Sequence, residues 1–150
     1  MRFSLALLTL ACVAALGAGA YAADTMAAKP TVYAPDSIKW MDGTGPLKGA
    51  QVAVLSGDPM KAGPFVMRIK FPDGMKVVPH SHPDAEQVTI LSGSLLFGVG
   101  DTLDPSKAMT ASAGTFASIP AGIHHFVIAK GETIVQVYAN GPFVMTPVKP

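Results

Sequence analysis

Three histidines and one glutamate have the types and spacing of metal ligands. His80 and His82 lie two positions apart, Glu86 follows four positions later, and His125 comes three positions after Gly122. Imidazole nitrogens combined with one carboxylate oxygen suit Fe, Mn, Ni, Cu, Co or Zn, whereas Ca and Mg prefer mostly oxygen. We therefore predict one divalent transition-metal ion, of unspecified identity, with His80, His82, Glu86 and His125 as its ligands.

An extended chain would place the first three ligands together. Side chains two residues apart in a strand share a face and lie about 6.6 Å apart, so His80 and His82 can converge on one ion. The pair Pro83-Asp84 favours a turn, and residues 87–91 then read as a returning strand. Glu86 can therefore reach the same site.

The fourth ligand belongs to a second predicted hairpin. Residues 116–119 and 124–129 read as its strands, and Pro120-Ala121-Gly122 as its turn. Proline presets the turn, and Gly122 can take a positive φ without a steric penalty. His124 should face the opposite side from His125, because neighbouring side chains alternate along a strand, and we expect it outside the site.

These residues form two longer patterns that resemble a known family. Gly74 to Gly93 reads G-x5-H-x-H-x3-E-x6-G, and Gly114 to His125 reads G-x5-P-x-G-x2-H. Both resemble the signature motifs of the cupin superfamily, with all nine specified residues present. The second motif usually ends in Asn four residues after its His, where this chain has Ala129. That Asn is not a ligand in the family, so the departure bears only on the local turn.

The resemblance implies an all-β fold, a cupin-type double-stranded β-helix (jelly-roll barrel) in a single domain. Regular short runs rich in Val, Ile and Phe, separated by Gly, Pro, Asp and Ser, indicate the same class. The runs are 51–55, 65–71, 88–91, 95–99, 116–119, 126–128 and 134–138, with a further first strand expected at 36–40. The pentapeptide Gly-Pro-Phe-Val-Met occurs at 63–67 and 141–145, which we interpret as two similar strand starts.

The amino terminus has the pattern of a cleavable signal peptide, residues 1–22. Arg2 precedes an uncharged apolar run over 4–20, and Ala20-Tyr21-Ala22 supplies small residues for cleavage before Ala23. A membrane anchor is the alternative, although the run is at the lower limit of a spanning helix. We predict a periplasmic or secreted protein with a flexible leader at 23–35 and the barrel domain at 36–150. The sole cysteine, Cys12, would be lost with the signal, which excludes disulfides and thiolate chemistry.

Charge patterning limits the partners. The chain has 11 basic and 10 acidic residues, and removing Arg2 with the signal leaves Arg68 as the only arginine. Without a basic patch we expect no nucleic-acid partner, and no membrane partner after signal cleavage. The class of partner that remains is a small-molecule ligand or substrate. Dimers are common among cupins, so a homodimer is expected by analogy.

Strand parity predicts what surrounds the ligands. Val78 would share a face with His80, Val88 and Ile90 with Glu86, and Val127 with His125, giving an aliphatic lining. Such a lining favours a small neutral or aromatic substrate. The first function class is a metal-dependent, dioxygenase-like oxidoreductase with Glu86 as a catalytic base. The alternatives are a non-catalytic metal- or ligand-binding module and a metal-dependent isomerase or lyase, and the fold alone does not choose among them.

Overall fold

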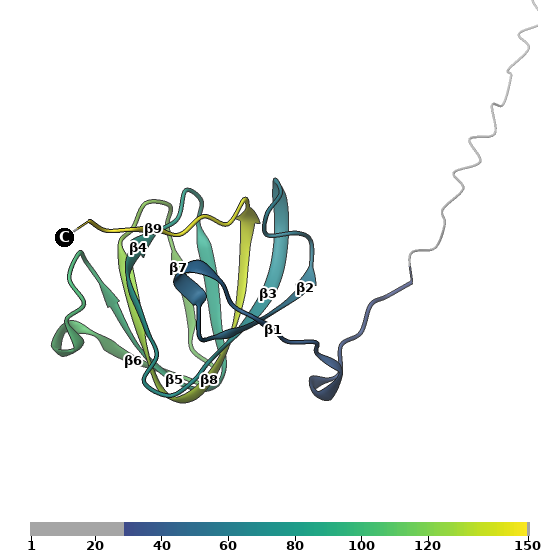
Figure 1. Ribbon diagram of the computed structural model, residues 1–150, viewed down its shortest axis with the longest axis horizontal. Coiled ribbons are helices and arrows are strands. Elements are labelled where there is room, and N and C mark those ends of the chain that lie inside the picture. Colours follow the sequence, from purple (N-terminus) through teal and green to yellow (C-terminus); the bar gives the residue numbers. More distant parts are fainter. Residues whose placement is uncertain (1–28, 150) are drawn as a thin grey trace, which may run out of the picture. The chain divides into compact units, whose positions relative to one another are not determined.

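The computed structural model describes residues 29–149, which contain nine β-strands and three short 3₁₀ helices (Figure 1). In chain order they are η1 Pro35–Ser37, β1 Met41–Asp42, η2 Gly45–Leu47, β2 Gln51–Ser56, β3 Gly63–Phe71, β4 Lys76–Ser81, β5 Glu86–Val99, η3 Pro105–Lys107, β6 Met109–Ser112, β7 Phe116–Ile119, β8 His125–Gly141 and β9 Thr146–Pro147. Every pairing between these strands is antiparallel. The predicted all-β class is confirmed.

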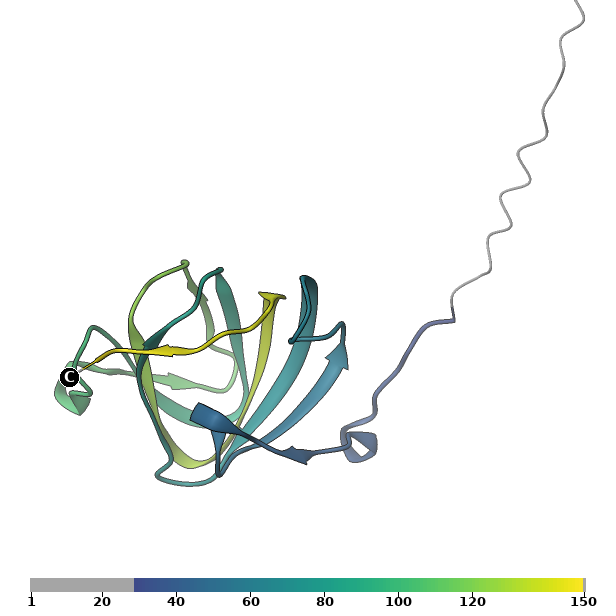
Figure 2. The ribbon, with the colours of Figure 1, turned by 45° about the horizontal axis from the view of Figure 1, so that its top comes forward.

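Two long strands connect the two layers of the fold. The first half of β5 pairs with the end of β8, from Glu86↔Ala139 to Ser92↔Ile134, and its second half pairs with the start of β8, ending at Val99↔His125. The described strands therefore form one layer ordered β1-β2-β3-β8-β5-β7 and another ordered β9-β4-β8-β5-β6. The curled sheet is a jelly-roll β-barrel (Figure 2).

Irregularities in β5 allow it to pass between the layers. The register with β8 shifts between Ile90 and Ser92 and again between Ser92 and Ser94. Bulges of this kind bend a strand and increase its twist. Gly93 has φ +75°, and a Cβ at this position would collide with the carbonyl oxygen of Glu132. The sequence pattern predicts separate strands on either side of this glycine, whereas the structure has one bent strand.

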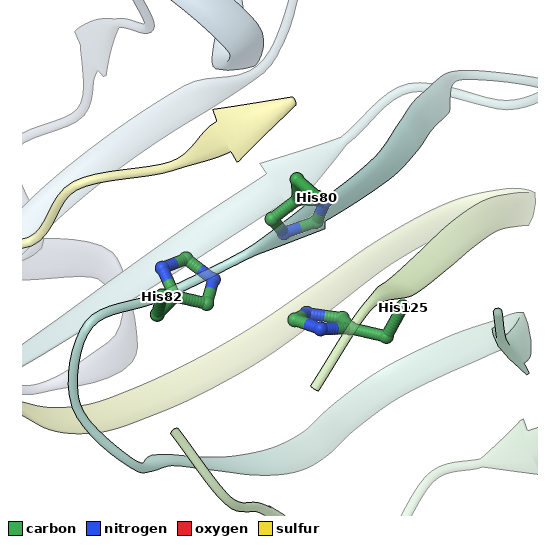
Figure 3. Close-up of side chains that lie close together, drawn as sticks. All are labelled: His80, His82 and His125. Atoms are coloured by element: carbon green, nitrogen blue, oxygen red, sulfur yellow. The ribbon is translucent and has the colours of Figure 1, made fainter. Parts of the chain in front are cut away.

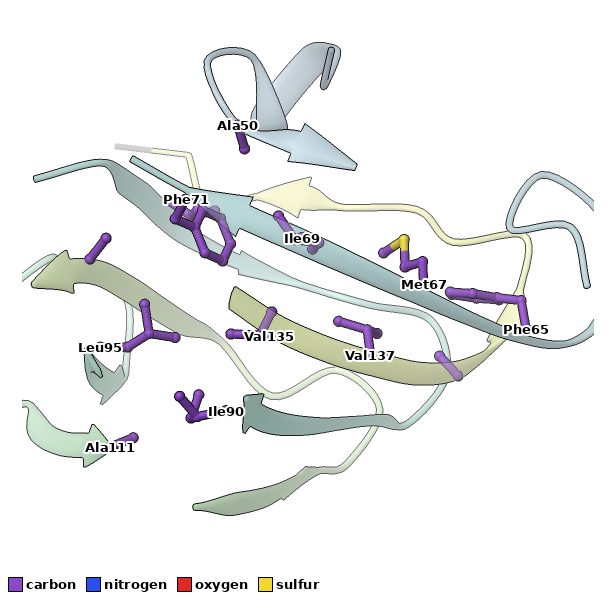
Figure 4. Close-up of a cluster of buried hydrophobic side chains, with 13 residues drawn as sticks. Ala50, Phe65, Met67, Ile69, Phe71, Ile90, Leu95, Ala111, Val135 and Val137 are labelled. Atoms are coloured by element: carbon purple, nitrogen blue, oxygen red, sulfur yellow. The ribbon is translucent and has the colours of Figure 1, made fainter. Parts of the chain in front are cut away.

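Both layers contribute buried apolar side chains to the barrel interior. Alternate residues of β3 point inward: Phe65, Met67, Ile69 and Phe71 are buried, while the residues between them are partly exposed. They pack against Val135 and Val137 of β8 in one apolar cluster (Figure 4). Alternation on one buried face is what period-two patterning predicts for a strand.

Two expectations at the amino-terminal side need comment. The predicted strand at 36–40 is wrong: Pro35 opens the 3₁₀ helix η1, the Ser37 hydroxyl donates to the Ala34 carbonyl oxygen at 2.8 Å, and the first strand begins only at Met41. Residues 29–34 of the predicted leader are exposed and form no strand or helix. The predicted signal peptide, 1–22, lies outside the described residues. No helix within 29–149 is long and apolar enough to cross a membrane.

Candidate metal centre

The structure brings the four predicted ligands together in the barrel. His80 lies on β4, His82 directly follows that strand, His125 opens β8, and one ring nitrogen of each lies within 4.8 Å of the others (Figure 3). Glu86 opens β5 in the opposite layer, and its Oε2 lies 3.5 Å from His82 Nε2 and 3.4 Å from His125 Nε2. All four residues are buried. Metal binding by this set stays a prediction.

A bulge in β4 sets the direction of the first two histidines. Val77 pairs with Val127, but His80 pairs with His125, so β4 contains one more residue than β8 between the two pairs. The bulge reverses the alternation: Val77 is buried inside the barrel, and Val78 is 51% exposed. The prediction that Val78 lines the site is therefore wrong. Pro79, which has no N–H to give to a ladder, occupies the irregular position.

Each histidine is fixed by one hydrogen bond to the backbone. The Nδ1 atoms lie at hydrogen-bonding distance from carbonyl oxygens: His80 to Val78 at 2.8 Å, His82 to Val144 at 2.9 Å, and His125 to Ile123 at 3.1 Å. Because a carbonyl oxygen only accepts, each Nδ1 must carry the proton and donate. In a neutral ring of this tautomer, the Nε2 atom keeps a free lone pair.

No lysine or arginine among the described residues lines the cavity beside the Glu86 carboxylate and the Nε2 atoms. His82 Nε2 is buried without a hydrogen-bond partner and faces the Glu86 carboxylate. Burial lowers the pKa of His80 to about 4 and also lowers the pKa of His82. Both rings are therefore neutral at pH 7 and cannot pair with Glu86 as imidazolium ions. A divalent cation would satisfy the Nε2 lone pairs and the carboxylate together, and the carbonyl partners of Nδ1 are the outer contacts usual for metal-binding histidines. The residues fit a transition metal.

The cluster borders a cavity of about 310 Å³ inside the barrel. Apart from the four candidate ligands, Thr115 and Ser118 are the only polar residues among the described ones that line it. The predicted lining residues Val88, Ile90 and Val127 are present, and Val77 takes the place of Val78. The site is therefore apolar apart from its ligands.

Sequence reasoning missed the contribution of the C-terminal segment to the site. The ring of Phe143 stacks on His82, with centroids 4.5 Å apart and planes at 19°, and Met145 also lines the cavity. Phe143 belongs to the second copy of the repeated pentapeptide, and its ring meets the ring of Phe65 from the first copy at 5.3 Å. The repeated pentapeptide was the feature of the sequence that could have pointed to this contribution. Only the first copy starts a strand, so the interpretation of the second copy is wrong.

His124 and Arg68 lie outside the site. His124 Nδ1 is 2.6 Å from Asp101 Oδ1, and the residue is not part of the histidine cluster. Arg68 alternates with the buried residues of β3, and its Nε donates to Gln136 Oε1 at 3.1 Å. Neither lines the cavity.

Comparison with known proteins now identifies the family. A family model described as a cupin domain matches residues 67–140, which contain both motifs and all four candidate ligands. The chain belongs to the cupin superfamily. Cupins commonly bind a metal, and the cluster of His80, His82 and His125 could hold one. A search of curated protein sequences finds no match.

Solved structures show the same cupin fold. The polyketide cyclase RemF from Streptomyces resistomycificus is similar with a TM-score of 0.68 and 16% identity, over 81% of this chain and 87% of that one. KdgF from Halomonas sp. has a TM-score of 0.58 and 18% identity, over 73% and 94% of the two chains. An oxalate oxidase has a TM-score of 0.50 and 26% identity, over 67% and 55%. Because these proteins differ in function and identity is low, the likeness does not select a reaction.

Proposed function

We propose that this cupin is a metal-dependent oxidoreductase, dioxygenase-like in type, that acts on a small neutral organic substrate. One observation carries the proposal. Three histidines, each with Nδ1 bonded to a backbone carbonyl oxygen, and one carboxylate meet at the wall of a cavity that is otherwise almost entirely apolar. A redox-active divalent metal bound there would supply Lewis-acid binding of a substrate oxygen and a path for electrons between substrate and dioxygen.

The chain itself supplies orientation and a base. Carbonyl oxygens hold the three imidazoles with Nε2 toward the centre, and the opposite layer of the barrel presents Glu86. Among the described residues that line the cavity, Glu86 is the one carboxylate. It can therefore accept a proton from a substrate hydroxyl or an acidic C–H group. The apolar walls keep water away from the reacting atoms and limit side reactions.

The lining also restricts the charge of the substrate. No lysine or arginine is among the described residues around the cavity. Phosphate and carboxylate groups are usually held by such cations, often by bidentate arginine. A phosphosugar or a dianion such as oxalate would thus have no protein cation to pair with, whereas a neutral enediol, catechol or flavonol would need none.

A metal-dependent isomerase or lyase is the second candidate. The position of Glu86 favours this class, because a buried carboxylate next to the histidine cluster could move a proton without any oxidant. A non-catalytic binding module would use the cavity and the ligands without turnover.

Oxygen uptake distinguishes these classes. Metal-free mature protein is loaded separately with Fe(II), Mn(II), Ni(II), Cu(II) and Zn(II), and each form is assayed with enediols, catechols, flavonols and thiols. The proposal predicts uptake only with redox-active metals, strongly reduced in Glu86→Gln and retained in His124→Ala. Turnover with Zn(II) in the absence of oxygen would establish the isomerase or lyase. Ligand binding without turnover under any condition would support the binding module.

A further inference from the structure

The cavity reaches well beyond the histidine cluster. His125 is paired with Val99 of β5. Leu95 comes four residues before Val99 in the same strand and is paired with both Ala129 and Ala111. At about 3.3 Å per residue, this is roughly 13 Å along the barrel. Leu95 and Ala111 both line the cavity, together with Phe71 and Ile90. We call these four residues the apolar chamber.

A small residue, Ala111, forms part of the wall of the apolar chamber. Ala111 is buried on β6 opposite Leu95, and all four chamber residues are at most 6% exposed. The whole cavity, about 310 Å³, is at the lower end of the range of small-molecule sites, about 300–1,000 Å³. It is therefore large enough for the body of a compact organic molecule as well as a group bound at the cluster.

Two exposed apolar side chains mark an opening to this cavity. Met109 is 59% exposed and Phe116 is 61% exposed, although both line the cavity. Met109 begins β6 and Phe116 begins β7, and among the described strands each of these pairs only with β5. Large apolar side chains at the rim of an apolar cavity are typical of binding sites rather than of ordinary surface.

We propose that the apolar chamber binds the body of the substrate, an aromatic or alicyclic group without charge, which enters past Met109 and Phe116. The oxygen-bearing end of the same molecule lies at the histidine cluster, and this part of the inference rests on the proposed function. A charged body is excluded, because an ion transferred to this lining would lose its hydration and gain no partner. The substrate class is thus a neutral molecule with one polar end and one apolar ring system.

A matched pair of fluorescent probes tests the chamber directly. N-phenyl-1-naphthylamine is neutral, and 8-anilinonaphthalene-1-sulfonate has the same aromatic skeleton with a sulfonate added. The mature protein, with metal bound, should bind the neutral probe saturably at one site per chain and at least tenfold more tightly than the sulfonate. Equal or tighter binding of the sulfonate would overturn the proposal.

Two substitutions locate the site. Ala111→Phe should fill the chamber and weaken binding of the neutral probe at least tenfold, with metal content unchanged. Ser112→Phe adds the same ring at the exposed neighbouring position of β6 and should leave binding within twofold. At the exposed rim, where a charge is easily accommodated, Met109→Lys should raise the relative affinity for the sulfonate at least threefold. Unaltered neutral-probe binding in Ala111→Phe, or an unaltered affinity ratio in Met109→Lys, would contradict the assignment.

The outcomes separate this inference from the proposed function. Oxygen uptake by a protein that does not bind the neutral probe would refute the chamber and leave the oxidoreductase standing. Probe binding that is lost in Ala111→Phe, in a protein without turnover, would support the chamber and refute the enzyme.

Discussion

The imidazole of His82 is held by Val144, a residue 62 positions away in the sequence, through a hydrogen bond of 2.9 Å from Nδ1 to the carbonyl oxygen. The ring of Phe143 stacks on the same imidazole. Strand β9 then pairs with β4 at His80↔Pro147. The C-terminal segment is therefore part of the candidate metal centre.

Removing the Phe143 ring should weaken metal binding. Phe143→Ala removes the ring that stacks on His82, and such ring pairs are worth about 0.5–1.5 kcal/mol, which corresponds to roughly two- to tenfold in metal affinity. Val144→Ala is the matched control: its side chain is exposed, and only its backbone oxygen contacts His82. A competition titration with a chromophoric chelator measures both affinities. Equal affinity of Phe143→Ala and the native chain would show that the segment only covers the site.

The stability of the metal-free protein should fall on acidification from about pH 6.5 to pH 4. Burial lowers the pKa of His80 to about 4 from 6.5, so the unfolded chain binds more protons in this interval. The contribution of His80 to stability is therefore complete above its pKa in the unfolded chain. It is lost as the pH falls toward its pKa in the folded protein, by up to about 3 kcal/mol.

Urea unfolding of the chelator-treated protein at several pH values measures this dependence. The variant His80→Gln should show a shallower decrease because it lacks the titrating ring. Greater stability of the metal-free native chain at pH 4.5 than at pH 7 would contradict the burial argument.

The bend in β5 should depend on Gly93. Gly93→Ala places a Cβ against the Glu132 carbonyl oxygen at a residue with φ +75°, and should cost roughly 1–3 kcal/mol of unfolding free energy. Gly114→Ala is the control, since φ there is also positive, at +90°, but no atom lies within 4 Å of the added Cβ. Chemical unfolding should show the larger loss for Gly93→Ala, and the reverse order would mean that the close approach is not what requires glycine.

Much of the candidate site could be predicted from local sequence. The two motifs predict the ligand residues His80, His82, Glu86 and His125, which lie together in the structure. The predicted hairpin of 116–119 with 124–129 is wrong, because β7 pairs with β5 and not with β8, and His125 instead meets His80 through the pairing of β8 with β4. The strand at 116–119 has the predicted bounds, although its pairing partner is β5.

Other features depend on contacts that local patterns do not contain. The bulge before His80 changes which side chains of β4 face inward, so the alternation that predicted Val78 at the site does not hold. The bulge becomes evident only from the register with β8. The role of Phe143 and Val144 depends on folding the C-terminal segment back over β4. Ser92-Gly93 has the composition of a turn, but pairing with β8 makes it a bend within one strand.

Export remains a prediction from residues 1–22. Expressed with its own leader in a Gram-negative host, the protein should be recovered from the periplasmic fraction with Ala23 as its first residue. Amino-terminal sequencing of that fraction measures this. Full-length chain in washed membranes would instead indicate an anchor.

Metal content is the most direct test of the central claim that the histidine cluster and Glu86 form a metal centre. Purified mature protein should contain close to one transition-metal ion per chain by elemental analysis. His82→Ala should lose most of that metal because it removes a buried Nε2 donor, whereas His124→Ala, which alters a partly exposed ring bonded to Asp101, should retain it. Equal metal content in the two variants, or none in the native protein under metal-replete expression, would contradict the account.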